Sequence, residues 1–495
     1  MLQRRMVSLK QAPFSEIVQM QIATTAGSDF KRRYDEFLRT YPTYRSTLHL
    51  DDLRASDYGQ LDVSGHTYLD YTAANLYADR QLQAHLEVLR GQVFGNPHSS
   101  NPAAVHIAHL VDDTRRSILE FFNASADDYT IIFTANASVA LKLVGESYPF
   151  TSQSRYLLTF DNHNSVNGIR EFARAKNATV DYVALDPSNM RIDDSILRRH
   201  FESATRPAEN LFAFPAQSNF SGVQHPLEWI GEAQAHGWDV FLDAAAHVAT
   251  NRLDLSVHRP EFVCVSFYKM FGYPTGVGCL LARKSALAKL RRPWFAGGTI
   301  TVASVQADRH YFASDAAAFE DGTLNYLEIP AIQVGLQYLE SLGIDAIHER
   351  VKCLTGWLLD KLIGLRHRNG RPLIQIYGPK DLRLRGGTIA FNFSDPNGRA
   401  IDHRVVDARA LQANISIRTG CFCNPGGGEI ALGLTADELR RCFSQPEHSE
   451  HFTVEDFRHC VDGKSTGAVR VSLGLASNFA DVERFVEFAE SFSSA

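Results

Sequence analysis

The sequence predicts an α/β protein with a mostly parallel seven-stranded sheet, and two observations lead to that prediction. From Tyr129 onward, short apolar runs, polar loops and helix-length segments alternate, which is typical of a parallel sheet covered by helices. Beyond about residue 330 this alternation stops, and long helices and separate apolar runs follow. We therefore expect a large α/β domain and a smaller α+β C-terminal domain.

The chain divides into three expected parts. Residues 1–45 form an N-terminal extension with one helix around Asp29–Thr40. Residues 46–330 form the large domain. For the first part of this segment, packing on the small domain is the alternative. Residues 331–495 form the small domain. Basic residues precede the first acid, Glu16, so an organelle-targeting role of the extension stays open.

Each expected strand of the large domain is a short apolar run bounded by turn residues. The seven runs are Thr130–Phe133, Arg155–Phe160, Thr179–Ala184, Asn210–Phe214, Trp238–Leu242, Phe262–Ser266 and Val277–Ala282. An eighth apolar segment, His66–Asn75, reads as a strand that runs into a loop, and Ala103–Phe122 reads as a helix.

The small domain is expected to combine helices with three strands. The helices are Ile329–Gly343, Ile344–Leu365 and Asp481–Phe492, and the strands are Ile374–Tyr377, Gly387–Asn392 and Val469–Ser472. The polar segment Thr435–Thr466 reads as loop and helix.

Composition excludes several classes of protein. The 495 residues are 44% hydrophobic and 21% charged, with a net charge of -6. No basic block indicates nucleic-acid binding, and no apolar run approaches the length that spans a membrane. Seven scattered cysteines argue against a disulfide framework and for a reducing compartment. We therefore expect a cytoplasmic protein.

Polar residues at the strand ends predict a cofactor site. Ligands of such sheets bind beyond the carboxyl ends of the strands. Thr134–Ser138 opens a helix there, which suits a phosphate. The other strand ends supply His163, Asn219, Asp243 and Lys269. Taken alone, Lys269 could be a surface lysine and Asp243 a helix-capping aspartate, since polar loops follow most strands. Taken together, the strand-end residues favour a phosphate-bearing aldehyde cofactor. Lys269 would form its Schiff base, and Asp243 would pair with its ring nitrogen.

A second motif, Arg418–Gly428, contains Cys421 and Cys423. Nothing nearby completes a metal site, and a disulfide between the two cysteines would be strained. They are either structural, or one is a mobile nucleophile that Arg418 holds as thiolate and the glycines allow to swing. Arg470, in an apolar run, is either a surface residue or a clamp for a substrate carboxylate.

These stretches resemble the class V, fold-type I pyridoxal-phosphate enzymes, and within them the cysteine-desulfurase-like domain of molybdenum cofactor sulfurase. The resemblance covers about residue 50 to the C-terminus. The matching segments are YLDYTAANLY, FGNPHSSNP, DNHNSVNGIRE, QSNFSG, LDAAAH, SFYKMFGYPTGVG, DGTLNYLEIPA, RTGCFCNPG and GAVRVSLGLASNFADV.

The resemblance implies pyridoxal 5′-phosphate as cofactor, bound covalently to Lys269. Asp243 would pair with the ring nitrogen, and His163 would stack on the ring. Asn219 would approach the phenolic oxygen. It would make this contact alone, because Ala246 stands where many desulfurases have a glutamine that also contacts this oxygen. The expected cofactor-binding residues are Ala137, Ser138, His163, Asn219, Asp243, Ser266, Lys269 and Thr323, with no metal.

The resemblance further implies a cysteine desulfurase that converts L-cysteine to L-alanine and carries the sulfur as a Cys423 persulfide. Arg470, Arg418 and Asn219 would bind the substrate. Thr323 would reach the cofactor phosphate of a partner subunit, which implies a homodimer.

Three questions stay open at this point. The sequence ends at Ala495, without the molybdopterin-binding domain of full-length sulfurases, so the sulfur acceptor could be a separate protein. Another class V reaction is the alternative, such as that of a C–S lyase or an aminotransferase-like enzyme. A non-catalytic partner protein is a third hypothesis, which the complete set Lys269, Asp243 and His163 disfavours.

Overall fold

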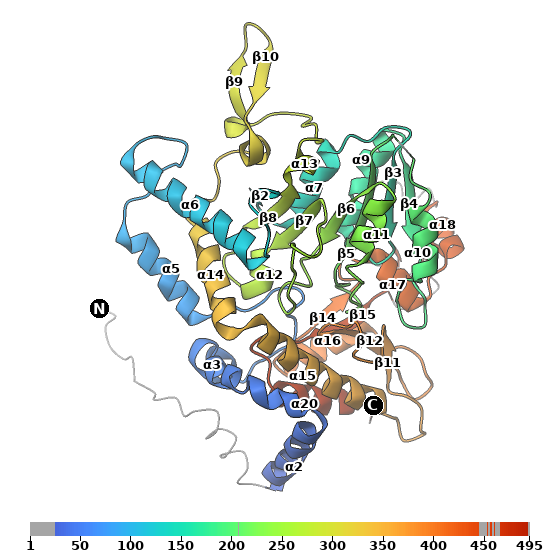
Figure 1. The fold of residues 1–495 in the computed structure, drawn as a ribbon. Coiled ribbons are helices and arrows are strands. Elements are labelled where there is room, and N and C mark those ends of the chain that lie inside the picture. The colour runs from blue at the N-terminus through green and yellow to red at the C-terminus, as the bar shows by residue number, and fades with distance from the viewer. Residues whose placement is uncertain are drawn as a thin grey trace.

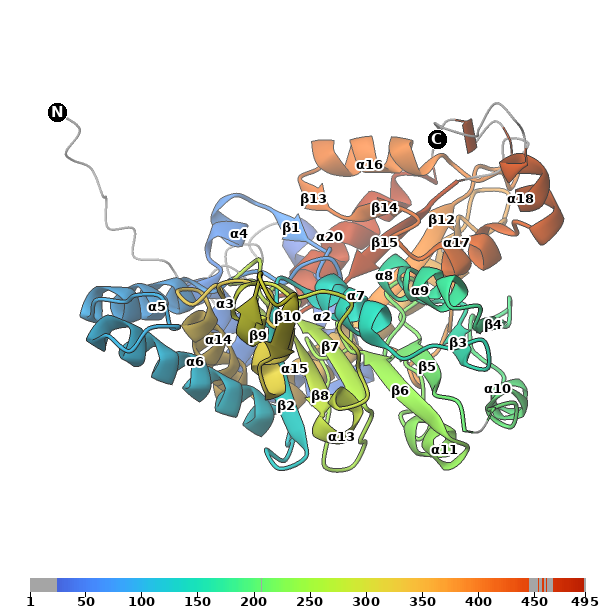
Figure 2. The ribbon, with the colours of Figure 1, turned by 90° about the horizontal axis from the view of Figure 1, so that it is seen from above.

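A computed structural model describes residues 25–495, apart from residues 206, 445–452, 454–455, 458–459, 461–465 and 494–495. The basic N-terminal segment that left a targeting role open lies outside the described residues. Figures 1 and 2 show a larger sheet with its helices and a second, smaller sheet beside α15, α16 and α20.

All seven expected strands of the large domain form one sheet. They are β2 (Tyr129–Thr134), β3 (Arg155–Thr159), β4 (Thr179–Val183), β5 (Asn210–Pro215), β6 (Trp238–Asp243), β7 (Phe262–Ser266) and β8 (Gly278–Arg283). The spatial order is β2-β8-β7-β6-β5-β3-β4. Every residue of β6 and β7 is buried, which explains why these strands read as continuous apolar runs rather than alternating ones.

Strand β8 is the antiparallel member of this mostly parallel sheet. It runs antiparallel to both of its neighbours, β2 and β7. The connection from Ser266 to Gly278 is too short for a crossover that would return the chain parallel, so β8 folds back directly.

Helices connect and cover these strands. They are α5 (Asp79–Gly91), α6 (Pro102–Phe121), α7 (Ala137–Ser147), α8 (Asn164–Asn167), α9 (Ile169–Ala175), α10 (Asp194–Phe201), α11 (Trp229–Ala235), α12 (Phe267–Phe271), α13 (Lys284–Leu287) and α14 (Ile329–Leu342). The predicted helix Ala103–Phe122 is α6, displaced by one residue at each end. Helices α7 and α12 follow β2 and β7 along the chain. Their first turns therefore lie at the same edge of the sheet.

The small sheet has one strand more than expected. Its antiparallel order is β11 (Ile374–Tyr377), β12 (Thr388–Phe393), β15 (Ala468–Ser472) and β14 (Arg418–Gly420). The missed strand, β14, is three residues long and lacks an apolar run. The accompanying helices are α15 (Ile344–Gly364), α16 (His403–Gln412), α17 (Pro425–Leu432), α18 (Ala436–Phe443) and α20 (Phe479–Glu490).

The N-terminal segments pack on the C-terminal part of the chain. They are α2 (Thr25–Thr40), η1 (Pro42–Thr47), α3 (His49–Asp57), α4 (Gln60–Val63) and β1 (Thr67–Tyr68). Phe37 of α2 is buried between the rings of Trp357 and Phe479. Strand β1 pairs with β13 (Ile415–Ser416). The expected strand His66–Asn75 is therefore much shorter than its apolar run.

A hairpin of β9 (Ile300–Ser304) and β10 (Arg309–Phe312) projects from the body of the molecule (Figure 1). Its side chains are exposed, although several are large and apolar; these are Val302, Val305, Tyr311 and Phe312.

Cys442 and Cys460 form a disulfide bond, although the scattered cysteines argued against a disulfide framework and for a reducing compartment. Their Cα atoms lie 5.5 Å apart, a proximity that a separation of 18 residues does not reveal. Among the described helices, none is both long enough and apolar enough to span a bilayer.

Candidate active site

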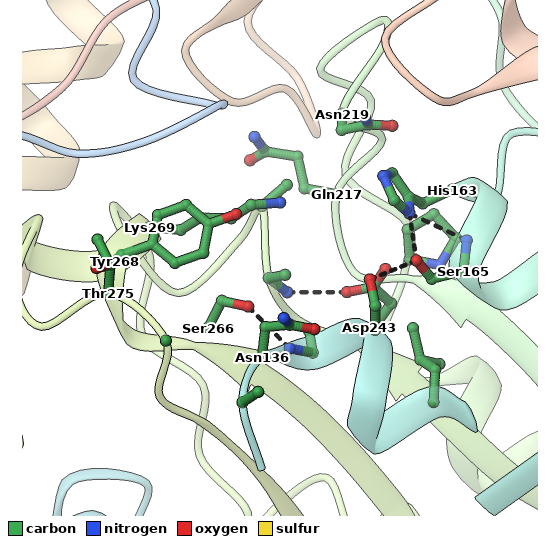
Figure 3. A pocket seen from close by; sticks show the side chains of 18 residues that line it. Asn136, His163, Ser165, Gln217, Asn219, Asp243, Ser266, Tyr268, Lys269 and Thr275 are labelled. Atoms are coloured by element: carbon green, nitrogen blue, oxygen red, sulfur yellow. Dashed lines mark hydrogen bonds between the residues drawn. The ribbon is translucent and has the colours of Figure 1, made fainter. Parts of the chain in front are cut away.

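A cavity of about 350 Å³ opens at the carboxyl ends of β2, β3, β5, β6 and β7. This is the sheet edge that the strand-end residues predicted. Seven of the expected residues line it: Ala137, Ser138, His163, Asn219, Asp243, Ser266 and Lys269. Figure 3 shows Lys269, His163 and Asp243 around this one space. Within the described part of the chain, no cluster of three or more His, Cys, Asp or Glu could hold a metal.

Lys269 lies in the first turn of α12, directly behind β7. Burial lowers the pKa of its amine below the ordinary value of 10.5, while Asp243 opposes the change and Arg470 adds to it. A lowered pKa leaves more of the amine neutral, which is the form that attacks an aldehyde.

Asp243 ends β6 and is held by two donors. Its Oδ1 accepts a hydrogen bond from the main-chain N–H of Ala245 at 3.0 Å and a weaker one from the thiol of Cys264 at 3.5 Å. Burial raises the pKa of Cys264 well above its ordinary value, with Asp243 adding to the effect. Cys264 therefore stays a neutral donor, and the carboxylate keeps a fixed orientation in the cavity.

His163 caps the short helix α8, which follows β3. Its Nδ1 accepts a hydrogen bond from the main-chain N–H of Ser165 at 3.1 Å. Burial lowers the pKa of His163 below its ordinary value of 6.5, against the opposing effect of Asp243. The imidazole is therefore neutral at pH 7 and able to accept a proton.

The N-terminus of α7 and Ser266 form an anion cradle. The Ser266 hydroxyl lies 2.9 Å from the main-chain N–H of Ala137. The backbone here leaves no room for a side chain on Gly278, because a Cβ there would lie 2.7 Å from Asn136 Cα. The main-chain N–H of Ala137 donates to the Ser266 hydroxyl and that of Val139 to Asn136 Oδ1, so it is the hydroxyl and the dipole at the N-terminus of α7 that suit a phosphate. With Lys269 and Asp243, these residues fit pyridoxal phosphate.

The lining residues without an expected role include Ser165, Gln217 and Tyr268. Ser165 lies 2.6 Å from Ser138, oxygen to oxygen, and so joins the phosphate cradle to the loop of His163. The sequence could have indicated Ser165 as a site residue, because it lies two residues after His163 in a loop at a strand end.

Arg470 and Arg418 converge on one carboxylate, Asp70. Arg470 donates to Asp70 Oδ1 at 3.0 Å and to the main-chain oxygen of Asn219 at 2.9 Å. Arg418 donates to Asp70 Oδ2 at 2.8 Å. Arg470 is only 3% exposed, so the surface alternative is wrong. Arg418 is half-exposed, and its guanidinium forms an ion pair with Asp70.

Asn219 has partners that the sequence did not suggest. Its Nδ2 donates to the main-chain oxygen of Phe422 at 2.8 Å, and its Oδ1 accepts from Asn424 at 2.9 Å. The side-chain amide therefore anchors the cysteine loop, where the resemblance implied a contact with the phenolic oxygen of the cofactor.

The cysteine loop is docked beside the cavity. The main-chain oxygen of Cys423 accepts a hydrogen bond from Asn164 N–H at 2.7 Å. Gly426 and Gly427 do not form the expected flexible run. They lie buried in the first turn of α17, and a Cβ on Gly426 would lie 2.0 Å from the main-chain oxygen of Phe160. These glycines permit close packing, and their predicted role in mobility stays a prediction.

Both loop cysteines are exposed, and one is electrostatically linked to the cavity. Among the influences on the pKa of Lys269 is a small raising effect of Cys423. Cys264, Cys279 and Cys353 are buried.

Thr323 is exposed and lines a different cavity, of about 280 Å³. The two cavities share Ala135 and Gly276 in their walls. Within a single chain, Thr323 therefore does not line the cavity that holds Lys269.

Comparison with known proteins defines the class. The family model of class V aminotransferases matches residues 67–485, and the chain belongs to this family. It is a fold-type I enzyme that depends on pyridoxal 5′-phosphate.

Individual proteins narrow the resemblance. The chain is 38% identical over 486 residues to a molybdenum cofactor sulfurase of Bos taurus, covering 93% of this chain and 53% of that protein. It is 36% identical over 493 residues to the molybdenum cofactor sulfurase of Solanum lycopersicum, covering 92% and 59%. The chain thus spans between half and three-fifths of these relatives.

A solved structure agrees in fold. The apo cysteine desulfurase of Thermococcus onnurineus superposes with a TM-score of 0.73 at 22% identity, covering 90% of this chain and 98% of that one.

Proposed function

We propose that the chain is a cysteine desulfurase of the molybdenum cofactor sulfurase type, which takes sulfur from L-cysteine and holds it on Cys423. The observation that carries this proposal is the placement of an exposed thiol loop beside a cavity that contains Lys269, Asp243 and His163. A transaminase would need the lysine and aspartate but has no use for a thiol at this position.

Each side chain of the site has its own role in the proposed reaction. Bound pyridoxal phosphate supplies an electron sink, and Asp243 keeps its ring nitrogen protonated. Arg470, held in place by Asp70 and by the main chain of Asn219, binds the substrate carboxylate with its remaining N–H groups. The neutral amine of Lys269 would move the substrate α-proton, and His163 would accept or return a proton in the same cavity.

Sulfur transfer follows at Cys423. Its thiolate attacks the substrate sulfur, so an S–S bond forms as the substrate Cβ–S bond breaks. The electron pair of that bond stays with carbon, which takes up the proton of the substrate thiol. The products are a Cys423 persulfide anion and alanine, so atoms and charge balance without an external oxidant.

The acceptor and compartment belong to the same proposal. The curated relatives are longer than this chain, so we assign the next step to a sulfur acceptor, either a separate protein or a further domain. The cytoplasm stays the proposed compartment because Cys421 and Cys423 are free thiols, and the Cys442–Cys460 disulfide bond is the observation that counts against it.

The active form proposed is a homodimer. Thr323 is exposed next to the cavity that adjoins the phosphate cradle, as expected of a residue that serves a neighbour. The projecting hairpin exposes Val302 and Tyr311, which are directly opposite each other on β9 and β10. An apolar patch of this kind is typical of a protein interface.

Product analysis tests the function. The purified protein, loaded with pyridoxal phosphate, should release alanine and persulfide sulfur from L-cysteine. Lys269→Ala should abolish both products. Pyruvate in place of alanine, unaffected by Cys423→Ser, would instead identify a C–S lyase, in which the cofactor alone expels the sulfur.

A further inference from the structure

The backbone of the cysteine loop is held in a costly conformation. Phe422 and Cys423 have φ angles of 56° and 55°, the left-handed region that side chains other than glycine adopt at an energetic cost. Two consecutive residues in this region persist only where surrounding contacts hold them.

Those contacts fall on the residues next to the thiol rather than on the thiol itself. The Cys423 side chain is exposed, whereas Phe422 is only 8% exposed and Asn424 is fully buried. Asn424 donates to the main-chain oxygen of Asp161 at 2.6 Å. The ring of Phe422 packs on Phe220 with the ring centroids 5.2 Å apart. The position of the thiol is therefore set by its neighbours.

One of these contacts reaches the proposed substrate clamp. The Phe422 ring lies on the guanidinium of Arg470, with 4.8 Å from Cζ to the ring centroid. Burial lowers the pKa of Arg470, while Asp70 opposes the change. The buried cation is thus incompletely compensated, and the ring face adds an attractive interaction.

We propose that Phe422 is a positioning residue, which holds Cys423 in its docked place by stacking on Arg470 and releases it when a substrate carboxylate binds there. A carboxylate on Arg470 neutralises the charge that attracts the ring. The contact then weakens, and the strained backbone at Phe422 and Cys423 favours departure. The thiol is thereby held while the clamp is empty and freed to move once an amino acid is bound.

This inference rests on the proposed role of Arg470, and thermodynamic reciprocity makes it testable. If carboxylate binding weakens the Phe422 contact, then removing that contact must strengthen carboxylate binding by the same factor. Because bound substrate already releases the ring, loss of the ring should leave persulfide formation at saturating substrate unchanged. The proposal thus predicts tighter carboxylate binding with an unaltered persulfide step, whereas general damage to the site would weaken both.

The experiment compares Phe422→Leu with Phe422→Tyr in the cofactor-loaded enzyme. Leucine keeps an apolar contact with Phe220 but has no ring face, whereas tyrosine keeps the ring. Binding of L-alanine, an amino acid without sulfur, is measured by calorimetry. Persulfide formation at saturating L-cysteine is measured separately in a single turnover.

We expect Phe422→Leu to bind L-alanine about two- to tenfold more tightly and to form the persulfide at the rate of the parent enzyme. Phe422→Tyr should match the parent enzyme in both measurements. Unchanged or weaker L-alanine binding in Phe422→Leu would overturn the proposal. If the parent enzyme itself formed no persulfide, the desulfurase function would fail, and the L-alanine measurement would still decide the role of Phe422.

Discussion

At the scale of single residues, Lys269 is subject to two opposing influences. Burial lowers the pKa of its amine, and the carboxylate of Asp243 raises it again. Because the net direction is downward, the neutral amine is available to the cofactor aldehyde at a lower pH than an ordinary lysine would allow.

The rate of cofactor attachment should report this balance. In the cofactor-free protein, we expect the attachment rate to rise with pH and reach half its maximum below 10.5. Asp243→Asn removes the charge that raises the pKa of Lys269, so its midpoint should move further down. Stopped-flow absorbance after mixing with pyridoxal phosphate measures both. A midpoint at or above 10.5 would contradict the effect of burial.

Attachment itself should depend on this one lysine. Borohydride reduction of the cofactor-loaded protein should link pyridoxal phosphate irreversibly to Lys269, as read by peptide mass. Lys269→Ala should lose the link while the remaining lysines stay unlabelled. A labelled peptide from elsewhere in the chain would show that the amine has been misassigned.

Residue-level prediction from sequence succeeded where a strand end determines the position. Asp243 and Lys269 follow buried strands, so their convergence on one sheet edge follows from the parallel arrangement. It did not reveal the partners of the Asn219 amide in the cysteine loop, because an amide in a loop has several partners in reach and only tertiary packing decides among them. The partner of Arg470 was missed for the same reason, because Asp70 is 400 residues away in sequence.

At the scale of elements, the glycines of α17 show how sequence alone misleads. A run of three glycines predicts a flexible loop. In the structure Gly426 and Gly427 bring the helix against the main chain of Phe160 and the ring of Phe220. Sequence cannot separate these two uses of glycine, because close approach depends on what lies opposite.

A substitution at this helix should distinguish the two uses. Gly426→Ala would place a methyl group 2.0 Å from the Phe160 carbonyl oxygen, so we expect a loss of about 1–3 kcal/mol in the free energy of unfolding. The control is Gly231→Ala in α11, where no atom lies within 4 Å of the new Cβ. It should be neutral or slightly stabilising. Chemical denaturation measures both, and equal stability of the two variants would argue for a loosely packed, mobile run.

At the scale of the whole molecule, the alternation of apolar runs was sufficient to predict a mostly parallel sheet of seven strands. The order of the strands was not predictable, because the pairing of β2 with β8 joins segments far apart in sequence. The projecting hairpin was also missed, since its exposed strands bury no apolar face that would give a clear pattern.

The hairpin should mediate assembly. Changing both Val302 and Tyr311 to aspartate places two charges on its cross-strand pair, which should shift the protein from dimer to monomer in sedimentation velocity and lower cofactor occupancy, because Thr323 no longer reaches a neighbour. Val257→Asp, at another exposed apolar side chain, is the matched control and should remain dimeric. A double variant that stays dimeric would remove the hairpin from the interface.

The central claim is that Cys423 carries the sulfur, and peptide mass analysis tests it most directly. The cofactor-loaded protein is incubated with L-cysteine, the thiols are alkylated, and the peptide that contains Cys421 and Cys423 is fragmented. We predict one additional sulfur atom on Cys423, its loss in Cys423→Ser, and its retention in Cys421→Ser. Additional sulfur on Cys421 that survives Cys423→Ser, or none on either residue while alanine is released, would contradict the account.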